Sequence, residues 1–368
     1  MASTADGSSL KRKVVAGEGD DHAVDSLPSK RTAAAADGAV VREVELERSL
    51  MTNGRGAAAA SSGSVPIIDL SRSNEECAEA MWAAATTVGF FIVVNHGIPE
   101  ASIDEVFAAS AAFFGQTREA KAEQSPFAPH LNSGYEYMTQ VRPSTGAPDQ
   151  KESLNITARI GAMERRWPVL PKMAGIDFEE VVRRFNRDAH ALGTRILSLL
   201  EPLACPHLEA GTLAAAHTLW QEDGQCTLRM LHYPPVADVD ALPPNYWRAG
   251  PHTDWCCATL LFQRPGNEGL ECAANPRACG GEGGWLKVDP VVGGIAVNIG
   301  DMLSRWSNDR LLSNLHRVRM PNASECRPPR SRFSVAFFMQ ADKKTLIESK
   351  HGTITAGDYI LGRIRSNF

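Results

Sequence analysis

A chain of 368 residues with 43% apolar and 22% charged side chains has the composition of an ordinary globular protein, which excludes a fibrous or wholly disordered chain. The formal net charge of -5 is small for this length, so the overall charge gives no reason to expect nucleic acid or a membrane surface as a partner. No stretch approaches the roughly 18 uninterrupted apolar residues of a membrane span, and the start lacks the apolar segment of a secretory signal. We therefore expect a cytoplasmic protein.

The cysteines agree with this expectation. There are eight, including the adjacent Cys256 and Cys257, and they form neither a disulfide framework nor a paired C-x2-C zinc pattern. Reduced thiols in a reducing compartment are the simplest interpretation.

Residues 1–63 are expected to form a disordered tail. They are rich in Ala, Gly, Ser and mixed charge, so they cannot bury enough apolar surface to offset the entropy lost on ordering. Two basic clusters, residues 11–13 and 30–31, leave nuclear import open as an alternative location. A solvated charge cluster is the simpler interpretation of these residues.

Order is expected to begin with a short apolar strand at residues 65–70, followed by a mixed region that extends to residue 205. Apolar periodicity predicts the further elements of this region in chain order: a helix over 75–87, a strand over 89–94, a helix over 103–114 and a long helix over 178–203. We treat residues 64–205 as the N-terminal half of the folded protein.

The pattern changes after Gln225 to short strands separated by Gly and Pro. The expected strands cover residues 226–233, 258–263, 285–288, 294–299 and 332–339. Many short strands at fairly even spacing favour a sandwich or barrel over a parallel doubly wound sheet. The predicted fold class is α+β, mainly β, with a jelly-roll (double-stranded β-helix) core over residues 206–368 and a helical N-terminal layer.

A candidate metal site lies in this second half. On an extended strand, side chains two residues apart point to the same face, so His252 and Asp254 can both be directed at one ion. His316 is the best candidate for a third ligand. Two histidines and one carboxylate on one face of an octahedral ion leave three positions open, as in non-haem iron(II) oxygenases. Taken alone, each histidine would be an ordinary core or surface residue.

A candidate anion site follows further along the chain. Arg332 and Ser334 share one strand face by the same two-residue spacing. A guanidinium fork beside a hydroxyl suits a carboxylate, because the fork binds both oxygens through charge-assisted hydrogen bonds. An edge-strand arginine in a surface ion pair is the alternative interpretation.

These residues belong to a longer series of motifs. In the first half they are Val65-Pro66-Ile67-Ile68-Asp69-Leu70, residues 89–98 and Asp149-Gln150-Lys151-Glu152; in the second they are His252-Thr253-Asp254, Thr259-Leu260-Leu261, Gly269-Leu270, Trp285, residues 297–301, Trp306-Ser307-Asn308, His316-Arg317-Val318 and Arg332-Phe333-Ser334. In this order they resemble the 2-oxoglutarate and iron(II)-dependent dioxygenases related to isopenicillin N synthase, flavonol synthase and gibberellin oxidases. The resemblance covers about residues 64–365.

The resemblance implies a role for each candidate. His252, Asp254 and His316 would bind Fe(II), and Arg332 with Ser334 would bind the distal carboxylate of 2-oxoglutarate. Tyr233 matches a tyrosine that donates to the same carboxylate, and Phe338 matches a position that often lines the substrate pocket. An ordinary core tyrosine and core phenylalanine are the alternatives.

The reaction implied by the resemblance is oxidation, most simply hydroxylation, of a small organic substrate. O₂ and 2-oxoglutarate would be consumed, succinate and CO₂ released, and ascorbate is a candidate reductant. Neither nucleic acid nor a membrane is expected as a partner, and the motifs leave the oligomeric state open.

Departures from the family pattern leave the substrate open. Many relatives carry Asn where this chain has Leu231; an insert spans residues 273–284, and Arg332 follows His316 by 16 residues where relatives have a shorter turn. Two alternatives also stay open. One is an oxidase of the same fold, like isopenicillin N synthase or an ascorbate-using enzyme, that does not consume 2-oxoglutarate. The other is a non-catalytic binding protein on this scaffold.

Overall fold

The computed structural model describes Glu45 and residues 60–141, 147–170, 175–238, 241–242, 246–274, 284–322, 324–325 and 328–367. Most of the expected tail and residues 275–283 of the insert lie outside these ranges. Residues 60–63, which were expected to belong to the tail, are part of a strand, because residues 60–64 pair in parallel with residues 285–287.

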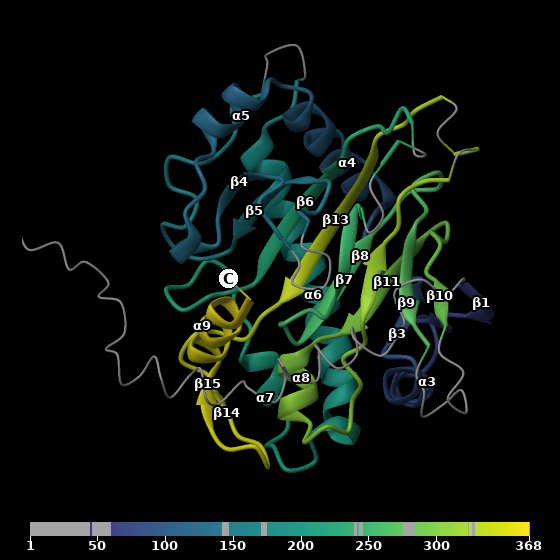
Figure 1. Ribbon diagram of the computed structural model, residues 1–368. Coiled ribbons are helices and arrows are strands. Elements are labelled where there is room, and N and C mark those ends of the chain that lie inside the picture. Colours follow the sequence, from purple (N-terminus) through teal and green to yellow (C-terminus); the bar gives the residue numbers. More distant parts are fainter. Residues whose placement is uncertain are drawn as a thin grey trace, which may run out of the picture.

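Two sheets face one another in the described part of the chain (Figure 1). The larger has the order β2 (Ile67–Asp69), β3 (Phe90–Val94), β11 (Gly294–Ile299), β8 (Ala258–Phe262), β13 (Arg332–Met339), β6 (Thr227–Tyr233), β5 (Glu152–Thr157) and β4 (Gly134–Tyr137). The smaller has the order β1 (Ala60–Ser64), β10 (Trp285–Lys287), β9 (Leu270–Ala273), β12 (His316–Val318) and β7 (Ala249–His252). This arrangement confirms the predicted jelly-roll core.

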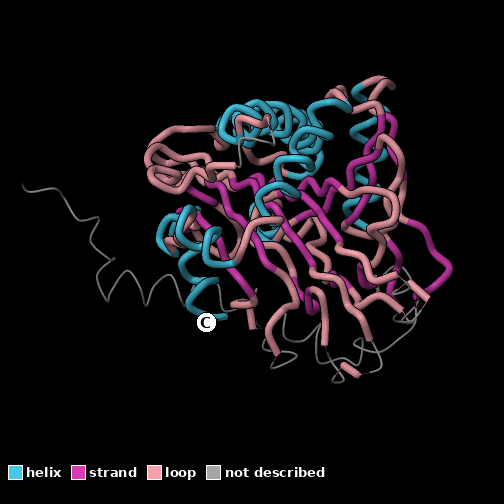
Figure 2. Tube along the Cα trace, turned by 90° about the horizontal axis from the view of Figure 1, so that it is seen from above, coloured by secondary structure: helices cyan, strands magenta, loops and turns pink. Residues whose placement is uncertain are grey.

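Helices cover the outer face of the larger sheet, and Figure 2 shows them gathered mainly along one side of the strands. The main ones are α3 (Asn74–Thr87), α4 (Glu100–Phe114) and α6 (Phe178–Ala204). Ser73 and Glu76 form a capping box that fixes the start of α3, and the Asp177 side chain caps α6. The helical N-terminal layer is therefore confirmed, and each of these three helices overlaps a predicted one.

The remaining elements are short: α5 (Arg118–Gln124), η1 (Pro129–Leu131), α7 (Thr212–Ala215), α8 (Asp301–Trp306), β14 (Leu346–Ile347), β15 (Ile354–Thr355) and α9 (Ala356–Asn367). Among the described residues, no helix combines the length and apolar character needed to cross a membrane.

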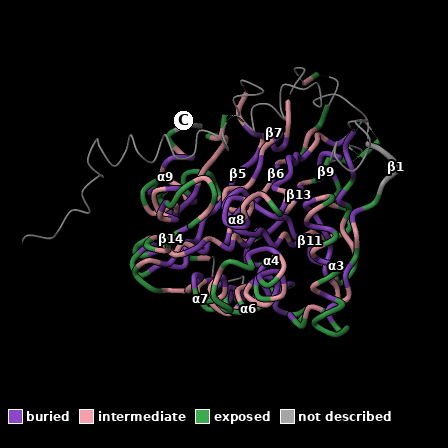
Figure 3. Tube along the Cα trace, turned by 90° about the horizontal axis from the view of Figure 1, so that it is seen from below, coloured by how far each residue is buried: buried purple, intermediate pink, exposed green. Residues whose placement is uncertain are grey.

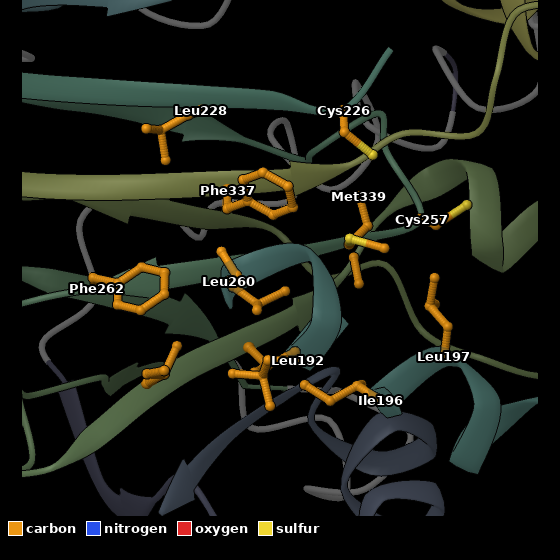
Figure 4. Close-up of a cluster of buried hydrophobic side chains, with 14 of the residues drawn as sticks. Leu192, Ile196, Leu197, Cys226, Leu228, Cys257, Leu260, Phe262, Phe337 and Met339 are labelled. Carbon is orange, nitrogen blue, oxygen red and sulfur yellow. The ribbon is translucent and has the colours of Figure 1, made fainter. Parts of the chain in front are cut away.

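Strand alternation divides the apolar residues into two cores. Leu228, Leu260 and Phe337 face α6 and pack against its leucine and isoleucine side chains (Figure 4). The next residue on each strand faces the space between the two sheets instead. Burial is greatest in this central region, while the outward surfaces of the helices are exposed (Figure 3).

One close approach holds α6 against the larger sheet. A Cβ added at Gly193 would lie 2.4 Å from the Sδ atom of Met339, so only glycine allows this contact without displacement. Each fully buried Leu, Ile or Phe at this interface contributes about 1.5–3 kcal/mol. The large outer core thus fixes β6, β8 and β13, whose inner faces are left for function.

Strand β5 was not predicted, although Leu154 and Ile156 alternate with polar residues along it. All six residues of Glu152–Thr157 are nevertheless buried. Their polar side chains are satisfied inside the protein: Asn155 bonds Arg229 and Glu136, and Thr157 bonds Thr227. Such internal hydrogen bonds allow a polar strand to be buried.

Candidate metal and co-substrate site

The three predicted metal ligands meet between the sheets. His252 ends β7 and His316 begins β12, and the two are paired directly across the antiparallel ladder, with ring centroids 4.3 Å apart. The Oδ1 atom of Asp254 lies 3.7 Å from His316 Nε2 and 4.0 Å from His252 Nε2. One donor atom from each residue lies within 4.8 Å of the other two. The predicted cluster is therefore assembled in the fold.

Backbone carbonyls set the orientation of both imidazole rings. His252 Nδ1 lies 2.7 Å from the carbonyl oxygen of Gly250, and His316 Nδ1 lies 3.3 Å from that of Asn314. A carbonyl oxygen only accepts, so each Nδ1 carries the proton and each Nε2 presents a lone pair. Phe90 packs edge-on against His316 at 5.4 Å between centroids and limits rotation of that ring.

The Asp254 carboxylate is held in the ionised form. Burial by itself would raise its pKa, but the positive charge that His316 carries when it is protonated, and hydrogen bonds from Thr259 (2.6 Å) and Asn298 (2.9 Å) to Oδ2, lower it below the ordinary value. Because both hydrogen bonds use Oδ2, Oδ1 is presented to the histidines. Sequence analysis had placed Thr259 and Asn298 in family motifs without assigning them this role.

A second group braces the turn that carries Asp254. The Asp301 backbone N–H donates to the carbonyl of Asp254 at 2.8 Å, and Thr253 Oγ1 donates to Asp301 Oδ2 at 3.0 Å. Arg363, which is fully buried on α9, reaches the same Oδ2 at 3.0 Å. The Gly300-Asp301 motif signalled half of this brace. Nothing in the sequence singled out Arg363.

The close packing of this turn explains Gly300. A Cβ there would lie 2.1 Å from the carbonyl oxygen of Cys256, too close for any side chain. The chain from residue 300 can therefore approach the metal-binding turn and donate the Asp301 N–H.

The predicted anion-binding residues also lie together. Arg332 pairs in register with Tyr233 across β13 and β6, and its guanidinium carbon lies 4.9 Å from the centre of that ring. Its nitrogens donate to Ser334 Oγ at 3.1 Å, Gln263 Oε1 at 3.0 Å and the carbonyl of Asn267 at 2.8 Å. Gln263 and Asn267 were not predicted, although Gln263 ends the expected strand.

Arg332 is not an edge-strand surface arginine. Strand β13 lies between β8 and β6, and the Arg332 side chain is only 2% exposed. Burial lowers the pKa of its guanidinium, which still keeps its charge because that pKa starts far above neutral. Within the described residues its hydrogen-bond partners are neutral and no carboxylate forms an ion pair with it. The arrangement suits an anionic ligand.

Phe338 lies on the same inner face of β13 as Arg332, Ser334 and Ala336. It pairs with Thr227 on β6 and Thr259 on β8 and is half-buried, whereas its neighbour Phe337 is fully buried against the helices. Phe338 is therefore the strand partner of Thr259, whose hydroxyl bonds Asp254.

Comparisons with known proteins agree with this geometry. Residues 65–170 match the family described as the N-terminal part of non-haem dioxygenases in morphine synthesis, and residues 224–341 match the 2OG-Fe(II) oxygenase superfamily. A 2-oxoglutarate-dependent dioxygenase of Didymella fabae is 29% identical over 326 residues, which cover 81% of this chain and 92% of the relative. A validamycin A dioxygenase of Streptomyces hygroscopicus subsp. limoneus is 29% identical over 303 residues, covering 76% and 78%.

A solved structure gives the same result. A full-length Neurospora crassa protein, solved in complex with alpha-KG, superposes with a TM-score of 0.70 at 28% identity, covering 84% of this chain and 99% of that one. Relatives that are dioxygenases, and a similar structure solved with 2-oxoglutarate, decide against the two alternatives of an oxidase that spares 2-oxoglutarate and a non-catalytic scaffold. The chain belongs to the 2OG-Fe(II) oxygenase superfamily and is a dioxygenase that uses Fe(II), 2-oxoglutarate and O₂.

Proposed function

We propose that His252, Asp254 and His316 hold the Fe(II), and that Arg332, Ser334 and Tyr233 bind the distal carboxylate of 2-oxoglutarate. The enzyme would then oxidise a small organic substrate, most simply by hydroxylation, with release of succinate and CO₂. One observation carries this proposal: two imidazole Nε2 atoms and one carboxylate oxygen converge from two strands and a turn.

The donor set fits iron. Three groups with outward lone pairs repel one another at 3.7–4.0 Å, and a divalent cation between them removes this repulsion. Two nitrogens and one oxygen match the facial arrangement of non-haem Fe(II) sites. When bound, Fe(II) supplies the activation of O₂ that is coupled to oxidative decarboxylation of 2-oxoglutarate.

Other groups of the protein would orient the metal ligands and hold 2-oxoglutarate. Gly250 and Asn314 fix the imidazole tautomers, while Thr259 and Asn298 keep Oδ1 of Asp254 directed at the ion. Arg332 would hold the far end of 2-oxoglutarate by a two-pronged contact, which fixes both its charge and its direction.

Apolar side chains of the inner core would limit the access of water to these groups. Apolar side chains between the sheets include Phe90, Leu231, Leu270, Val318 and Ala336. A dry site strengthens the electrostatic interaction between Arg332 and the carboxylate, and it protects a reactive centre from side reactions.

The substrate is proposed to be a small molecule, with Phe338 as part of its pocket. The Neurospora relative has been solved with thymine, which supports a small substrate. The cytoplasm is the proposed compartment, which agrees with six buried cysteines that are all free thiols in the described residues.

Anaerobic reconstitution tests the proposal. Fe(II) and then 2-oxoglutarate are titrated into the metal-free protein, and the visible charge-transfer band of the chelated keto acid is recorded. A metabolite library is then screened in air for succinate release. Absence of both the band and succinate would contradict the proposed ligand set.

A further inference from the structure

We propose that Arg229 and Phe338, with Asn155 and Glu136 behind them, form a substrate subsite that selects a flat, conjugated molecule carrying an oxygen acceptor. Suitable acceptors are a carboxylate or a ring carbonyl. This inference rests on the proposed function, because the subsite receives substrate only if the neighbouring triad holds the iron.

The fold places both residues on the inner face of the larger sheet. Leu228 points at α6 (Figure 4), so Arg229, the next residue of β6, points to the opposite side. Phe338 follows Phe337 on β13 in the same way. Arg229 and Phe338 are half-buried, whereas Leu228 and Phe337 are fully buried, so their remaining exposure lies on the side of the site.

Register places this pair beside the metal ligands. Phe338 is paired with Thr259, and Thr259 donates its hydroxyl proton to Asp254 at 2.6 Å. Arg229 is four residues from Tyr233, about 13 Å along β6, while Tyr233 is opposite Arg332. The two inner-face guanidinium groups are therefore separate. Arg332 lies toward the co-substrate end and Arg229 lies toward the other end of the same strands.

A hydrogen-bonded row fixes the Arg229 side chain. Its Nε donates to Asn155 Oδ1 at 2.7 Å, and Asn155 Nδ2 donates to Glu136 Oε2 at 2.9 Å. Asn155 is completely buried, so this row is built into β4, β5 and β6. The guanidinium carbon lies 5.1 Å from the centre of the Phe338 ring. A charged fork and an aromatic face are thus held next to each other.

This pair favours one class of ligand. A guanidinium donates strongly to carboxylate or carbonyl oxygens, and a phenylalanine ring stacks on flat conjugated molecules. A saturated ring would lose the stacking, and a protonated amine would be repelled by Arg229. The expected substrate is therefore planar, oxygen-bearing and neutral or anionic.

Calorimetry on the anaerobic Fe(II) and 2-oxoglutarate complex tests the inference, since no turnover occurs without O₂. Thymine and benzoate are the flat, oxygen-bearing probes; cyclohexanecarboxylate lacks the flat ring, and benzylamine is flat but cationic. We expect a flat oxygen-bearing probe to bind, and the other two to bind at least tenfold more weakly. Equal binding of all four probes, or binding of none, would overturn the inference.

Variants locate the binding. Arg229→Gln is expected to raise the Kd of the probe roughly tenfold or more, and Arg229→Lys is expected to raise it less. Phe338→Leu is expected to raise it roughly three- to tenfold. The matched control is Arg183→Gln, because Arg183 also stacks on an aromatic ring, 4.1 Å from the centre of Trp220, but lies on the outside of α6. The proposed subsite would be contradicted if Arg229→Gln bound the probe with wild-type affinity, or if Arg183→Gln lost as much affinity for the probe as Arg229→Gln.

The same titrations separate this inference from the proposed function. If 2-oxoglutarate does not bind to the iron-loaded wild-type protein, the proposed function fails. If 2-oxoglutarate binds normally but the affinity for the probe is the same in wild type and in Arg229→Gln, only the proposed substrate subsite is wrong.

Discussion

Two carboxylates of this protein, Glu152 and Asp254, have opposite surroundings. Glu152, on β5, has its charge matched within the protein: Lys121 Nζ is 2.7 Å away, His232 Nδ1 is 2.6 Å away, and the Tyr135 hydroxyl also donates to it. Among the described residues, the hydrogen-bond donors to Asp254 are neutral and both reach one oxygen, while its other oxygen faces the ring nitrogens of two histidines.

The difference separates a structural group from a reactive one. A carboxylate paired with a lysine needs nothing further, so the Glu152 cluster ties α5, β4, β5 and β6 together. At Asp254, a carboxylate oxygen and two imidazole nitrogens converge, which is the arrangement that a divalent cation fills. Convergent lone pairs, rather than burial or a low pKa alone, distinguish the metal site.

The largest expected effect is the loss of turnover when one of the three proposed metal ligands is replaced. His252→Ala, Asp254→Ala and His316→Ala should each abolish iron-dependent succinate release, because two ligands alone do not hold the ion in place. Metal content and succinate are measured together with circular dichroism. Undiminished succinate in a folded variant would remove that residue from the ligand set.

A substitution in the Glu152 cluster should lower stability and leave turnover per folded molecule largely unchanged. Glu152→Gln leaves Lys121 buried without its anion, so the free energy of unfolding should fall by about 3–5 kcal/mol. Iron binding by the protein that remains folded should persist. Chemical denaturation measures the loss, and Glu179→Gln in the exposed pair with Arg183 is the control, with about 0–1 kcal/mol.

The pH dependence of stability gives a second test of the Glu152 cluster. Burial would raise the pKa of Glu152, but His232, Lys121 and Tyr135 together lower it below 4.5. A lowered folded-state pKa stabilises the protein above pH 4.5, and this contribution is lost as the pH falls through the folded-state value. Wild type should therefore lose stability below about pH 4.5 more steeply than Glu152→Gln. Parallel acid curves would contradict the assignment.

Arg332 gives the next effect in size. Arg332→Ala removes the only charge proposed to meet the distal carboxylate and should weaken 2-oxoglutarate binding by about 2–5 kcal/mol. Arg332→Lys keeps the charge but loses the fork, so the KM for 2-oxoglutarate should rise with a smaller change in kcat. A wild-type KM in Arg332→Ala would make this residue structural.

The two neutral donors beside Arg332 should matter less. Tyr233→Phe and Ser334→Ala each remove one hydroxyl, and each should cost about 0.5–1.5 kcal/mol in 2-oxoglutarate binding. Titration by the charge-transfer band gives both values. A loss as large as that of Arg332→Ala would reverse the proposed order of importance.

The smallest effect is expected at the N-terminus. Deleting residues 1–59, which keeps β1, should leave turnover and melting temperature nearly unchanged, because the composition of this segment offers no packed core. A lower melting temperature or a loss of turnover would show that the segment docks on the folded part.

Much of the site could be predicted because its chemistry follows local spacing. His252 with Asp254, and Arg332 with Ser334, are two residues apart on extended chain, so period-two alternation predicts a shared face. His316 could be named as the best candidate for a third ligand, but spacing could not predict its pairing with His252, because the two residues are 64 positions apart.

The groups that support the site were harder to predict. Arg363 acts through a helix whose periodicity was not recognised, and Asn155 lies on a strand whose polar face is buried as fully as its apolar face. Their roles arise from long-range contacts, which residue type and spacing do not encode. The same limit applies to Arg229, whose meaning depends on which face of β6 it occupies.

The contact of Arg363 with Asp301, which braces the turn that carries Asp254, has a practical consequence for handling the protein. Helix α9 is mechanically joined to the metal-binding turn, since Arg363 and Thr253 share one oxygen of Asp301. A fusion partner, a label or a protease cut at this helix would disturb the ion pair between Arg363 and Asp301, whose shared oxygen accepts from Thr253, the residue between two proposed iron ligands. Tags are better placed at the other end, where the chain joins the outermost strand of the smaller sheet.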